Sequence, residues 1–425
     1  MPEKNGSKPE PGESDVILYR GRTFFPGFII PLLLVFLLVF LLGTTSSHAR
    51  GRAVIKSDIT TGWQRESNFY KSESNTRTID TYHVKPGVKL GYTTDKSLAS
   101  LDYWFKILQY DDQDDTPAGE VKADDFNYTE HRAKFTTQTQ PTDRLLLGID
   151  NLYWKTRDSA NSQANSNVVD RYKYTMNRLT PRLAYNFGEK FGIDLSYSNQ
   201  VLDYLDDDPG EGEDANENRG RFILIYNFNQ RTSFDLNCQY WNMDYDKTTS
   251  DYNSSQVMVN VNRQFNYFTF AAGMGYHTRD FDQTTTTGDI EKMVWKLSLT
   301  GQNPPDAEGI PRSSIYLALG SNLNDIGSGG SYYTSTRLDA AMSRLFAEKI
   351  NCTIRGWYQN SEYEGSDRTD DRWTISGAVD YLINHLFTIG FEGGMERRDS
   401  NEVGRDFDNH YLMLNAKFAY NPGSR

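Results

Sequence analysis

Hydrophobic and polar residues alternate along most of the chain. The stretch FGIDLSYSNQV, Phe191–Val201, places Phe, Ile, Leu, Tyr and Val on alternate residues, with polar or small residues between them. Because successive side chains of a strand point to opposite sides, this stretch predicts a strand with one apolar, aromatic face and one polar face. The same alternation predicts further strands, with apolar rows at Val84–Tyr92, Phe222–Phe228, Val257–Val261, Phe268–Tyr276, Met293–Leu299, Phe387–Met395 and Leu412–Tyr420.

The connections between these rows alternate between short and long. Short connections include TTDKS (Thr93–Ser97), QPTDR (Gln140–Arg144), FGEK (Phe187–Lys190) and FAEK (Phe346–Lys349), and long polar ones include Asp111–Asp125, Arg157–Asn167 and Asp206–Asn218. Short turns at one rim and long loops at the other are typical of outer-membrane barrels, where they are periplasmic and extracellular respectively. One short-side connection, QNPPDAEGIPR (Gln302–Arg312), is long and contains three prolines, and we expect it in the periplasm as well.

The spacing of the rows predicts the fold class. Hairpins of about 40 residues over residues 50–425 give roughly 18 strands, an even number as bacterial barrels require. The chain is therefore expected to be all-β: a single closed antiparallel transmembrane β-barrel with short periplasmic turns and long extracellular loops. Lipid then contacts one face of each strand, closure satisfies the backbone hydrogen bonds, and the polar face lines a lumen. The alternative, a soluble sandwich or repeat array, explains neither the alternation of loop lengths nor the many aromatic residues.

The composition of the chain fits a barrel. Its 425 residues are 37% hydrophobic and carry a formal net charge of −12, yet they include 27 Tyr, 23 Phe and 7 Trp. Disordered chains contain few aromatic residues, whereas Tyr and Trp concentrate at the two interfaces of a membrane, where we expect them here. The acidic balance argues against nucleic-acid binding, which usually requires a basic patch.

The N-terminal region predicts export from the cytoplasm. FIIPLLLVFLLVFLL, Phe28–Leu42, follows Arg20 and Arg22 and precedes the small-x-small pattern Ser47–Ala49. This arrangement predicts a signal peptide over residues 1–49, cleaved near Ala49, which leaves residues 50–425 as the barrel. An uncleaved membrane anchor is the alternative, but the apolar run of about 15 residues is shorter than the ~20 that a spanning helix needs.

Several segments combine a strand, a tight turn and an aromatic-rich strand that ends in a Tyr/Asp loop. Examples are YHVKPGVKLGY followed by SLASLDYWFKILQY, and NQRTSFDLNCQYWNMDYD. In this pattern, most of residues 50–425 resembles the outer-membrane β-barrel porins associated with bacterial exopolysaccharide operons. The resemblance implies an outer-membrane protein that serves polysaccharide export, with periplasmic export components as partners, and it implies no catalytic residues. Unlike many outer-membrane proteins, the chain ends in NPGSR after its last apolar row.

Charged residues alternate with the apolar rows and are expected to face the lumen. Because rings of charged side chains set the selectivity of a pore, a basic lumen favours anions. The alternative is that the inward bases and acids neutralise one another around a hydrated pore. The predicted pore-lining bases are Lys85, Lys89, Lys106, Arg132, Lys134, Arg178, Arg182, Lys292, Lys296, Arg337, Arg355, Arg372 and Lys417. The predicted inward acids are Asp102, Glu130, Asp150, Asp194, Asp235, Asp339, Asp380, Glu392 and Glu396.

The sequence contains no motif for catalysis or for a cofactor. The six His are scattered, no Gly-x-Ser-x-Gly elbow accompanies them, and neither a haem site nor a Cys/His metal cluster is present. The acidic stretch Asp206–Glu217 lacks the ordered ligand spacing of a calcium loop. We therefore predict no enzymatic activity, no cofactor and no metal site.

Three functions remain open at this point. The barrel is an export channel or scaffold for an extracellular polysaccharide, a general diffusion porin for small solutes, or a structural barrel that sheaths a partner such as a periplasmic electron carrier. A diffusion porin usually folds a long loop into its pore, and no loop here is obviously long enough. The expected partners are outer-membrane lipid and lipopolysaccharide, with no nucleic acid.

The two cysteines are predicted to be free thiols. Cys238 is in phase with Phe234 and Leu236, and Cys352 is in phase with Ile350 and Ile354, so both face lipid. By the strand count they lie about six strands apart. At ~4.8 Å between neighbouring strands this separation exceeds the ~7 Å Cα limit for a disulfide.

Overall fold

The computed structural model describes residues 51–116, 121–157, 171–205, 213–246, 249–282, 288–303, 312–324 and 332–420. The predicted signal peptide, residues 1–49, lies outside these ranges, as does most of the acidic stretch Asp206–Glu217. None of the described residues belongs to a helix that is long and apolar enough to cross a membrane.

The described residues form one antiparallel sheet of 18 strands and a short 3-10 helix, η1 (Ala123–Phe126). The strands are β1 (Arg52–Glu66), β2 (Ile79–Thr93), β3 (Ser97–Asp112), β4 (Tyr128–Thr142), β5 (Leu145–Thr156), β6 (Tyr174–Asn186), β7 (Phe191–Tyr204), β8 (Ala215–Asn229), β9 (Thr232–Tyr245), β10 (Tyr252–Gln264), β11 (Phe268–Phe281), β12 (Ile290–Gln302), β13 (Ser313–Asn324), β14 (Tyr333–Phe346), β15 (Ile350–Tyr363), β16 (Thr369–Leu382), β17 (Phe387–Ser400) and β18 (Phe407–Tyr420).

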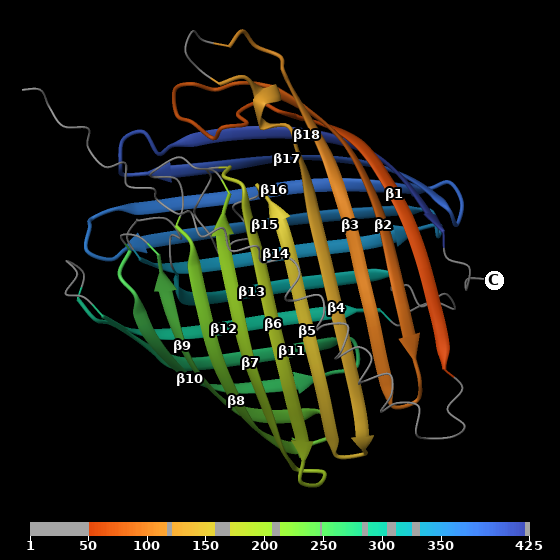
Figure 1. Ribbon diagram of the computed structural model, residues 1–425, viewed down its shortest axis with the longest axis vertical. Coiled ribbons are helices and arrows are strands. Elements are labelled where there is room, and N and C mark those ends of the chain that lie inside the picture. The colour runs from red at the N-terminus through yellow and green to blue at the C-terminus, as the bar shows by residue number, and fades with distance from the viewer. Residues whose placement is uncertain are drawn as a thin grey trace, which may run out of the picture. The chain divides into compact units, whose positions relative to one another are not determined.

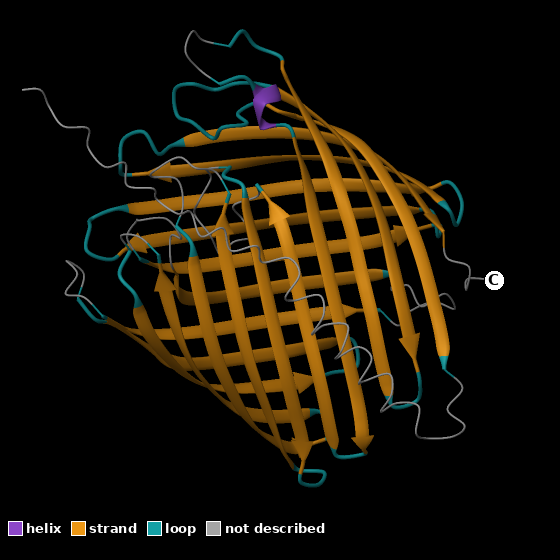
Figure 2. Ribbon diagram, in the orientation of Figure 1, coloured by secondary structure: helices purple, strands orange, loops and turns teal. Residues whose placement is uncertain are grey.

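The sheet closes on itself as a barrel (Figure 1). Each strand pairs with the next, and β1 pairs with β18 over Ser57–Glu66 and Tyr411–Tyr420. Figure 2 shows the two walls of the barrel crossing at a steep angle, as the tilted strands of a closed sheet must. Closure leaves no strand edge unpaired, which is what allows a sheet to stand in lipid. The predicted fold class, an antiparallel barrel of about 18 strands, is confirmed.

The strand register aligns the apolar rows into one outer surface. Across five successive strand pairs, Leu195, Phe222, Cys238, Val257 and Tyr276 lie directly opposite their neighbours, and the row continues to Met293 on β12. Most of these side chains are exposed, from 37% for Phe222 to 63% for Met293. Exposed apolar side chains in register around a closed sheet form a lipid-facing belt.

The lengths of the connections alternate as the sequence predicts. The short ones lie between β2 and β3, β4 and β5, β6 and β7, β8 and β9, β10 and β11, β14 and β15, and β16 and β17. We call this rim the short-turn end and the opposite rim the long-loop end. The proline-containing connection from β12 to β13, residues 303–312, is long, and its residues 304–311 lie outside the described ranges.

Tyrosines mark the limit of the belt toward the long-loop end. The hydroxyl of Tyr197 donates a hydrogen bond of 2.6 Å to Asn218 on the neighbouring strand, and Tyr240 donates one of 3.0 Å to Asn253. Tyr276 donates one of 2.5 Å to Glu291 in the same way. An apolar ring with a hydrogen-bonded hydroxyl suits the membrane interface.

Four of the seven tryptophans differ from the expectation that aromatic residues lie at the interfaces. They occupy the inward face of their strands, whereas Trp63, Trp295 and Trp373 face outward. The physical reason is their position in the alternation: each of the four shares the polar face of its strand, where it contacts an inward cation. The inward tryptophans are Trp104, Trp154, Trp241 and Trp357.

The two cysteines lie where their phase predicts. Cys238 is on β9 and Cys352 is on β15, six strands further around the barrel. Cys238 pairs with the lipid-facing Phe222 and Val257, and Cys352 pairs with Val379. Both thiols are free.

Candidate functional site: the lumen and its covered end

All of the bases predicted to line the lumen lie on the strand face opposite the lipid-facing belt. On β12, for example, Met293 and Leu297 are exposed on the outer face, so Lys292 and Lys296 project from the inner one. In the same way Lys89 lies opposite Asp102 of β3, on the side away from Leu90 and Leu101. The other members occupy this face on β2, β3, β4, β6, β14, β15, β16 and β18.

Several of these bases are ion-paired with acids of the inner wall or of the loop after β15. Lys292 lies 2.9 Å from Glu364, and Arg337 lies 2.9 Å from Asp339. The remaining pairs are Arg182 with Asp194, Arg355 with Glu392 at 3.5 Å, and Arg372 with Glu396. Partial neutralisation of the lumen, one of the two alternatives from the sequence, therefore applies to these positions.

Other inward bases remain exposed to water inside the barrel. Lys89, Lys134, Arg178 and Lys296 are exposed, and none has an ion-pair partner among the described residues. Arg178 donates hydrogen bonds to Gln200, a neutral side chain. Because these residues are exposed on the inner face of a closed sheet, water reaches them from the lumen. The lumen around them is therefore not filled by packed side chains.

The sequence interpretation missed further inward arginines. Arg219 and Arg221 project inward from β8, Arg279 from β11 and Arg398 from β17. The signal was present, because Arg219 and Arg221 alternate with the apolar row that begins at Phe222.

The inward tryptophans each carry a cation on their ring. The Lys85 ammonium lies 4.2 Å from the centroid of Trp104, and the Arg219 guanidinium lies 4.2 Å from that of Trp241. Arg132 lies 4.9 Å from Trp154, and Arg337 lies 4.2 Å from Trp357. Such contacts hold both partners in place, since the ring face attracts the cation. The inner wall thus presents flat aromatic surfaces beside positive charge.

Two loops turn inward at the long-loop end. Phe69, in the connection from β1 to β2, is 1% exposed and packs with Ile79, Leu108 and Tyr110. Ala123, in the connection from β3 to β4, completes this cluster and is 0% exposed. Leu108 and Tyr110 belong to the inward face of β3, so both loops reach the interior side of the wall. The two loops thus cover part of the inner wall at this rim by packing against each other and against β3.

Polar contacts fasten these loops. Arg77 of the β1–β2 connection donates a hydrogen bond of 2.8 Å to the carbonyl of Val121 and pairs with Asp112. Lys71, whose φ is 53°, extends across to β17, where its ammonium lies 2.8 Å from Glu396. Burial lowers the pKa of Lys71, and the Glu396 carboxylate opposes this effect.

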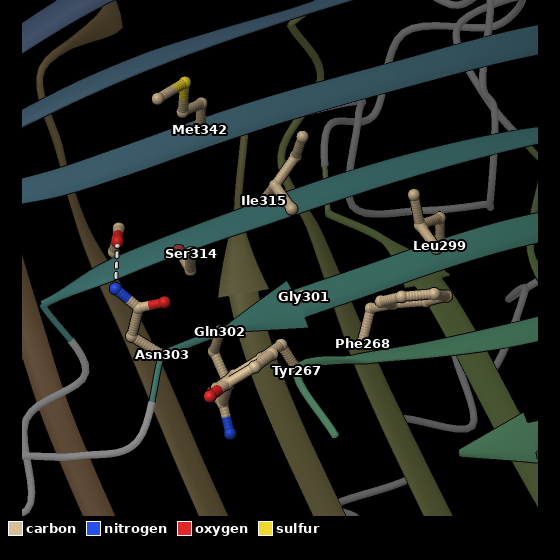
Figure 3. Close-up of a pocket in the computed structure, with 10 residues that line it drawn as sticks. Tyr267, Phe268, Leu299, Gly301, Gln302, Asn303, Ser314, Ile315 and Met342 are labelled. Atoms are coloured by element: carbon tan, nitrogen blue, oxygen red, sulfur yellow. Dashed lines mark hydrogen bonds between the residues drawn. The ribbon is translucent and has the colours of Figure 1, made fainter. Parts of the chain in front are cut away.

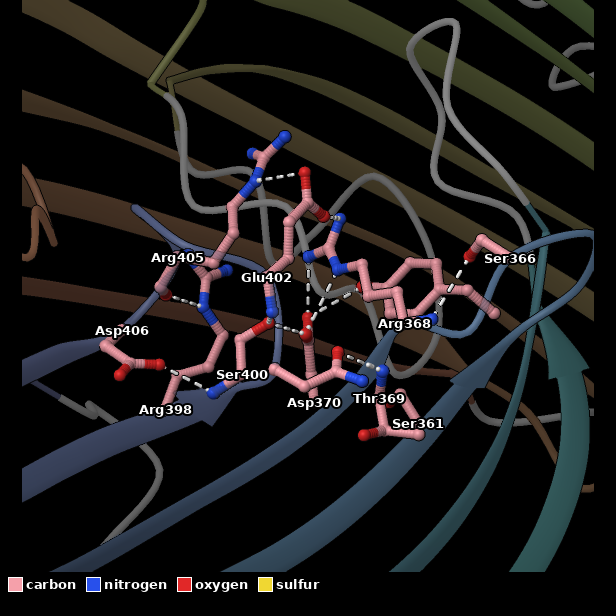
Figure 4. A network of polar contacts seen from close by, with 12 residues as sticks. Ser361, Ser366, Arg368, Thr369, Asp370, Arg398, Ser400, Glu402, Arg405 and Asp406 are labelled. Atoms are coloured by element: carbon pink, nitrogen blue, oxygen red, sulfur yellow. Dashed lines mark hydrogen bonds and ion pairs between the residues drawn. The ribbon is translucent and has the colours of Figure 1, made fainter.

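A second network joins the loops after β15 and β17 (Figure 4). The Asp370 carboxylate is 0% exposed and accepts hydrogen bonds from Arg368 at 2.6 and 3.0 Å, from Tyr363 at 2.9 Å and from Ser400 at 2.6 Å. Arg368 also lies 3.2 Å from Glu402 in the next loop. A fully bonded buried carboxylate of this kind fixes the two loops relative to each other.

The opposite part of the long-loop end contains a larger apolar cluster. Tyr252 and Tyr332 enclose the guanidinium of Arg279, which lies 4.0 Å from one ring and 5.0 Å from the other. Tyr174, Met176 and further inward residues of β6 to β13 complete the cluster. The described part of the lumen is therefore packed at the long-loop end and open to water in its middle and short-turn half.

The described residues contain no group of three or more His, Cys, Asp or Glu arranged to hold a metal ion. The histidines are dispersed: His131, for instance, faces outward, where its ring nitrogen lies 3.0 Å from the hydroxyl of Tyr103.

The comparisons with known proteins concern barrels of this type. The family described as "Putative beta-barrel porin 2" matches residues 315–420, from β13 to the end of β18. Similar solved structures include Pseudomonas aeruginosa OccK9 (OpdG), at 12% identity and a TM-score of 0.47, with 87% of this chain and 98% of that chain covered. Pseudomonas aeruginosa OpdK, solved with vanillate, has 13% identity and a TM-score of 0.46, with 87% and 99% covered. Acinetobacter baumannii OccAB2 has 11% identity and a TM-score of 0.47, with 87% and 98% covered.

No curated protein matches the chain. At these sequence identities, the functions of individual residues in the similar structures cannot be assigned to residues of this protein. A closed barrel with a lipid-facing belt, matched over its last strands by a porin family, is an outer-membrane protein.

Proposed function

We propose that this barrel is an outer-membrane channel through which small hydrophilic solutes diffuse, with a preference for anions. The observation that carries the proposal is the exposure of Lys89, Lys134, Arg178 and Lys296 on the inner face of a closed sheet. Water-accessible charge inside a barrel requires a hydrated lumen, and charged side chains that line such a lumen select ions by sign.

The paired bases contribute less to selectivity than the unpaired ones. Arg182 and Lys292 each face a carboxylate, so an ion in the lumen meets little net charge at these positions. Arg178 and Lys296 have no ion-pair partner among the described residues and are exposed. The anion preference is therefore assigned to the unpaired set, and the loops at the long-loop end limit the size of the solutes that enter.

A liposome-swelling assay tests this function. Proteoliposomes of the wild-type barrel should swell in isotonic solutions of small neutral sugars, and should admit a small organic anion faster than a cation of equal size. The variant K134Q/R178Q/K296Q should keep sugar permeation and lose most of the preference for the anion. K349Q, in the exposed turn between β14 and β15, is the matched control and should behave as wild type. Swelling no faster than that of empty liposomes would exclude a diffusion channel.

Polysaccharide export is a second candidate, supported by the four inward tryptophans. A sugar ring presents an apolar C–H face that packs on the face of an aromatic ring, while nearby cations contact hydroxyl or acidic groups of a polymer. Trp104 and Trp154 lie edge to face with centroids 6.2 Å apart, on neighbouring parts of one wall. In cells that secrete the polymer, W104A/W154A should reduce its extracellular amount, and the outward W373A should not. Equal secretion by all strains, including one without the protein, would exclude this role.

A further inference from the structure

A groove lies on the lipid-facing side of the barrel at the short-turn end (Figure 3). It has a volume of about 420 Å³ and lies across β11 to β14, within the ~300–1,000 Å³ of ordinary small-molecule sites. Its walls are the apolar side chains of Phe268, Leu299, Ile315 and Met342. We call these residues, with Gly301, the rim groove.

A glycine makes the rim groove possible. A Cβ atom on Gly301 would lie 2.9 Å from Cγ2 of Ile315 and 3.3 Å from the carbonyl oxygen of Tyr267, too close for any other residue without a shift of its neighbours. Toward the rim, the groove ends at a polar pair, in which the amide of Asn303 donates a hydrogen bond of 2.9 Å to the hydroxyl of Ser313. The groove is thus apolar toward the membrane centre and polar toward the water.

Two arginines flank the rim groove on the outer face. Arg344 of β14 lies opposite Ser313 and Cys352, and Arg263 of β10 lies opposite Phe270, so both project toward lipid. Each guanidinium lies 5.1 Å from the ring of a phenylalanine two residues nearer the turn. Both side chains are exposed and neither has an ion-pair partner among the described residues. In the described strands no other lysine or arginine faces lipid in the short-turn half.

We propose that the rim groove binds an anionic phospholipid of the periplasmic leaflet. By the rule for bacterial barrels the short-turn end faces the periplasm, where the leaflet consists of phospholipid rather than lipopolysaccharide. One acyl chain packs against Phe268, Ile315 and Met342, and the headgroup phosphate lies at the interface beside Arg344, which is opposite the groove residue Ser313. Arg263 is four strands away, about 19 Å at ~4.8 Å per strand, and adds to the positive potential at this part of the rim. Arginine suits this role because its planar guanidinium donates paired hydrogen bonds to phosphate.

Charge and shape together favour this occupant over an apolar peptide or another copy of the chain. Two cations without ion-pair partners among the described residues attract an anionic headgroup at the membrane interface. The groove is apolar toward the membrane centre and ends in a polar hydrogen-bonded pair at the interface, which suits an amphipathic molecule such as a phospholipid. The site lies on the outer surface, so it is independent of the channel function proposed above.

Native mass spectrometry of the full-length barrel tests the proposal. The protein is purified in a mild detergent with equal amounts of phosphatidylglycerol and phosphatidylethanolamine, and the lipids that stay bound are counted. Wild type should retain phosphatidylglycerol preferentially, and R263Q/R344Q should retain it about 25-fold less, at roughly fivefold for each interfacial arginine. R397Q is the matched control, because Arg397 faces lipid at the opposite rim and is paired with Asp399.

A second pair of variants tests the apolar part and does not depend on charge. L299W fills the rim groove with a larger apolar ring and should release the lipid although both arginines remain, whereas L297W, two residues along the same outward face, should not. Heat-modifiable migration on a gel confirms that each variant is folded. Equal retention of the two lipids by wild type, or unchanged retention in both R263Q/R344Q and L299W, would overturn the proposal. A periplasmic protein bound in place of lipid would do so as well.

Discussion

Arginine placed at Leu297 should cost far more stability than arginine placed at Ser298, one residue further along β12. Leu297 is 41% exposed on the outer face, opposite Ala272 and Leu319 of the adjacent strands. Ser298 points to the lumen between Ala271 and Ala318, whose small side chains leave room for a longer one. The two substitutions add the same charge and differ only in whether lipid or water receives it.

The expected difference follows from the position of residue 297 near the middle of the 13-residue strand β12. An arginine on the lipid face near the bilayer midplane destabilises a barrel by about 2–4 kcal/mol, which lowers the folding equilibrium constant about 30- to 700-fold. A surface change facing the lumen is expected to stay within about 0.5 kcal/mol. L297R should therefore unfold at clearly lower denaturant than S298R.

The assay is reversible unfolding by urea or guanidinium chloride in lipid vesicles, followed by tryptophan fluorescence. Comparison with wild type gives the change in unfolding free energy for each variant, and L297K and S298K repeat the test with a different cation. If S298R is as destabilising as L297R, or more so, the assignment of the two strand faces is wrong.

Three further outcomes are expected. Removing the buried Asp370 carboxylate in D370A should lower the unfolding free energy by about 1–3 kcal/mol, because Tyr363 and Ser400 lose their acceptor, while Arg368 keeps only Glu402 as an ion-pair partner among the described residues; limited proteolysis at Arg368 should accelerate, and an unchanged cleavage rate would count against the network. K71M removes the contact of the β1–β2 loop with Glu396 and should raise the single-channel conductance, whereas the control K349Q should not. An unchanged conductance in K71M would mean that this loop does not limit the opening of the channel. A cysteine at Glu402, in the long-loop end, should react with an impermeant thiol reagent on intact cells and one at Glu189, in the short turn after β6, should not; the reverse pattern would invert the topology.

For most strands, the sequence shows which residues face lipid and which face the lumen, because side chains alternate with a period of two. Lys292, Lys296 and Cys238 therefore lie on the faces that the sequence assigns to them. The same phase would have placed Trp104 inside, since it alternates with Leu101, Tyr103 and Ile107 and shares the face of Asp102 and Lys106. The preference of tryptophan for membrane interfaces led to the opposite expectation.

The covered end of the lumen could not be predicted in this way. Lys71 and Glu396 are 325 residues apart in the chain and meet only because β1 pairs with β18, which brings the β1–β2 loop close to β17. Phe69 and Ala123 lie in polar connections, where a single apolar residue gives no periodic signal, yet both are buried against β3. Contacts of this kind depend on closure of the barrel and on loop conformation, for which local alternation carries no information.

The rim groove could not be predicted from the sequence either. Leu299 belongs to a predicted outward row, but the space between it, Ile315 and Met342 arises from Gly301 and from the register of four strands. The sequence supplies the residue types, whereas the hollow is a property of the assembled sheet.

The most direct test of the channel is the reversal potential of the purified barrel in a planar bilayer under a salt gradient. Discrete conductance steps are expected, with a reversal potential on the anion-selective side that shifts toward zero in K134Q/R178Q/K296Q and stays unshifted in K349Q. Absence of any conductance above that of the bare bilayer, or a cation-selective reversal potential that the triple variant leaves unchanged, would contradict the proposed channel function.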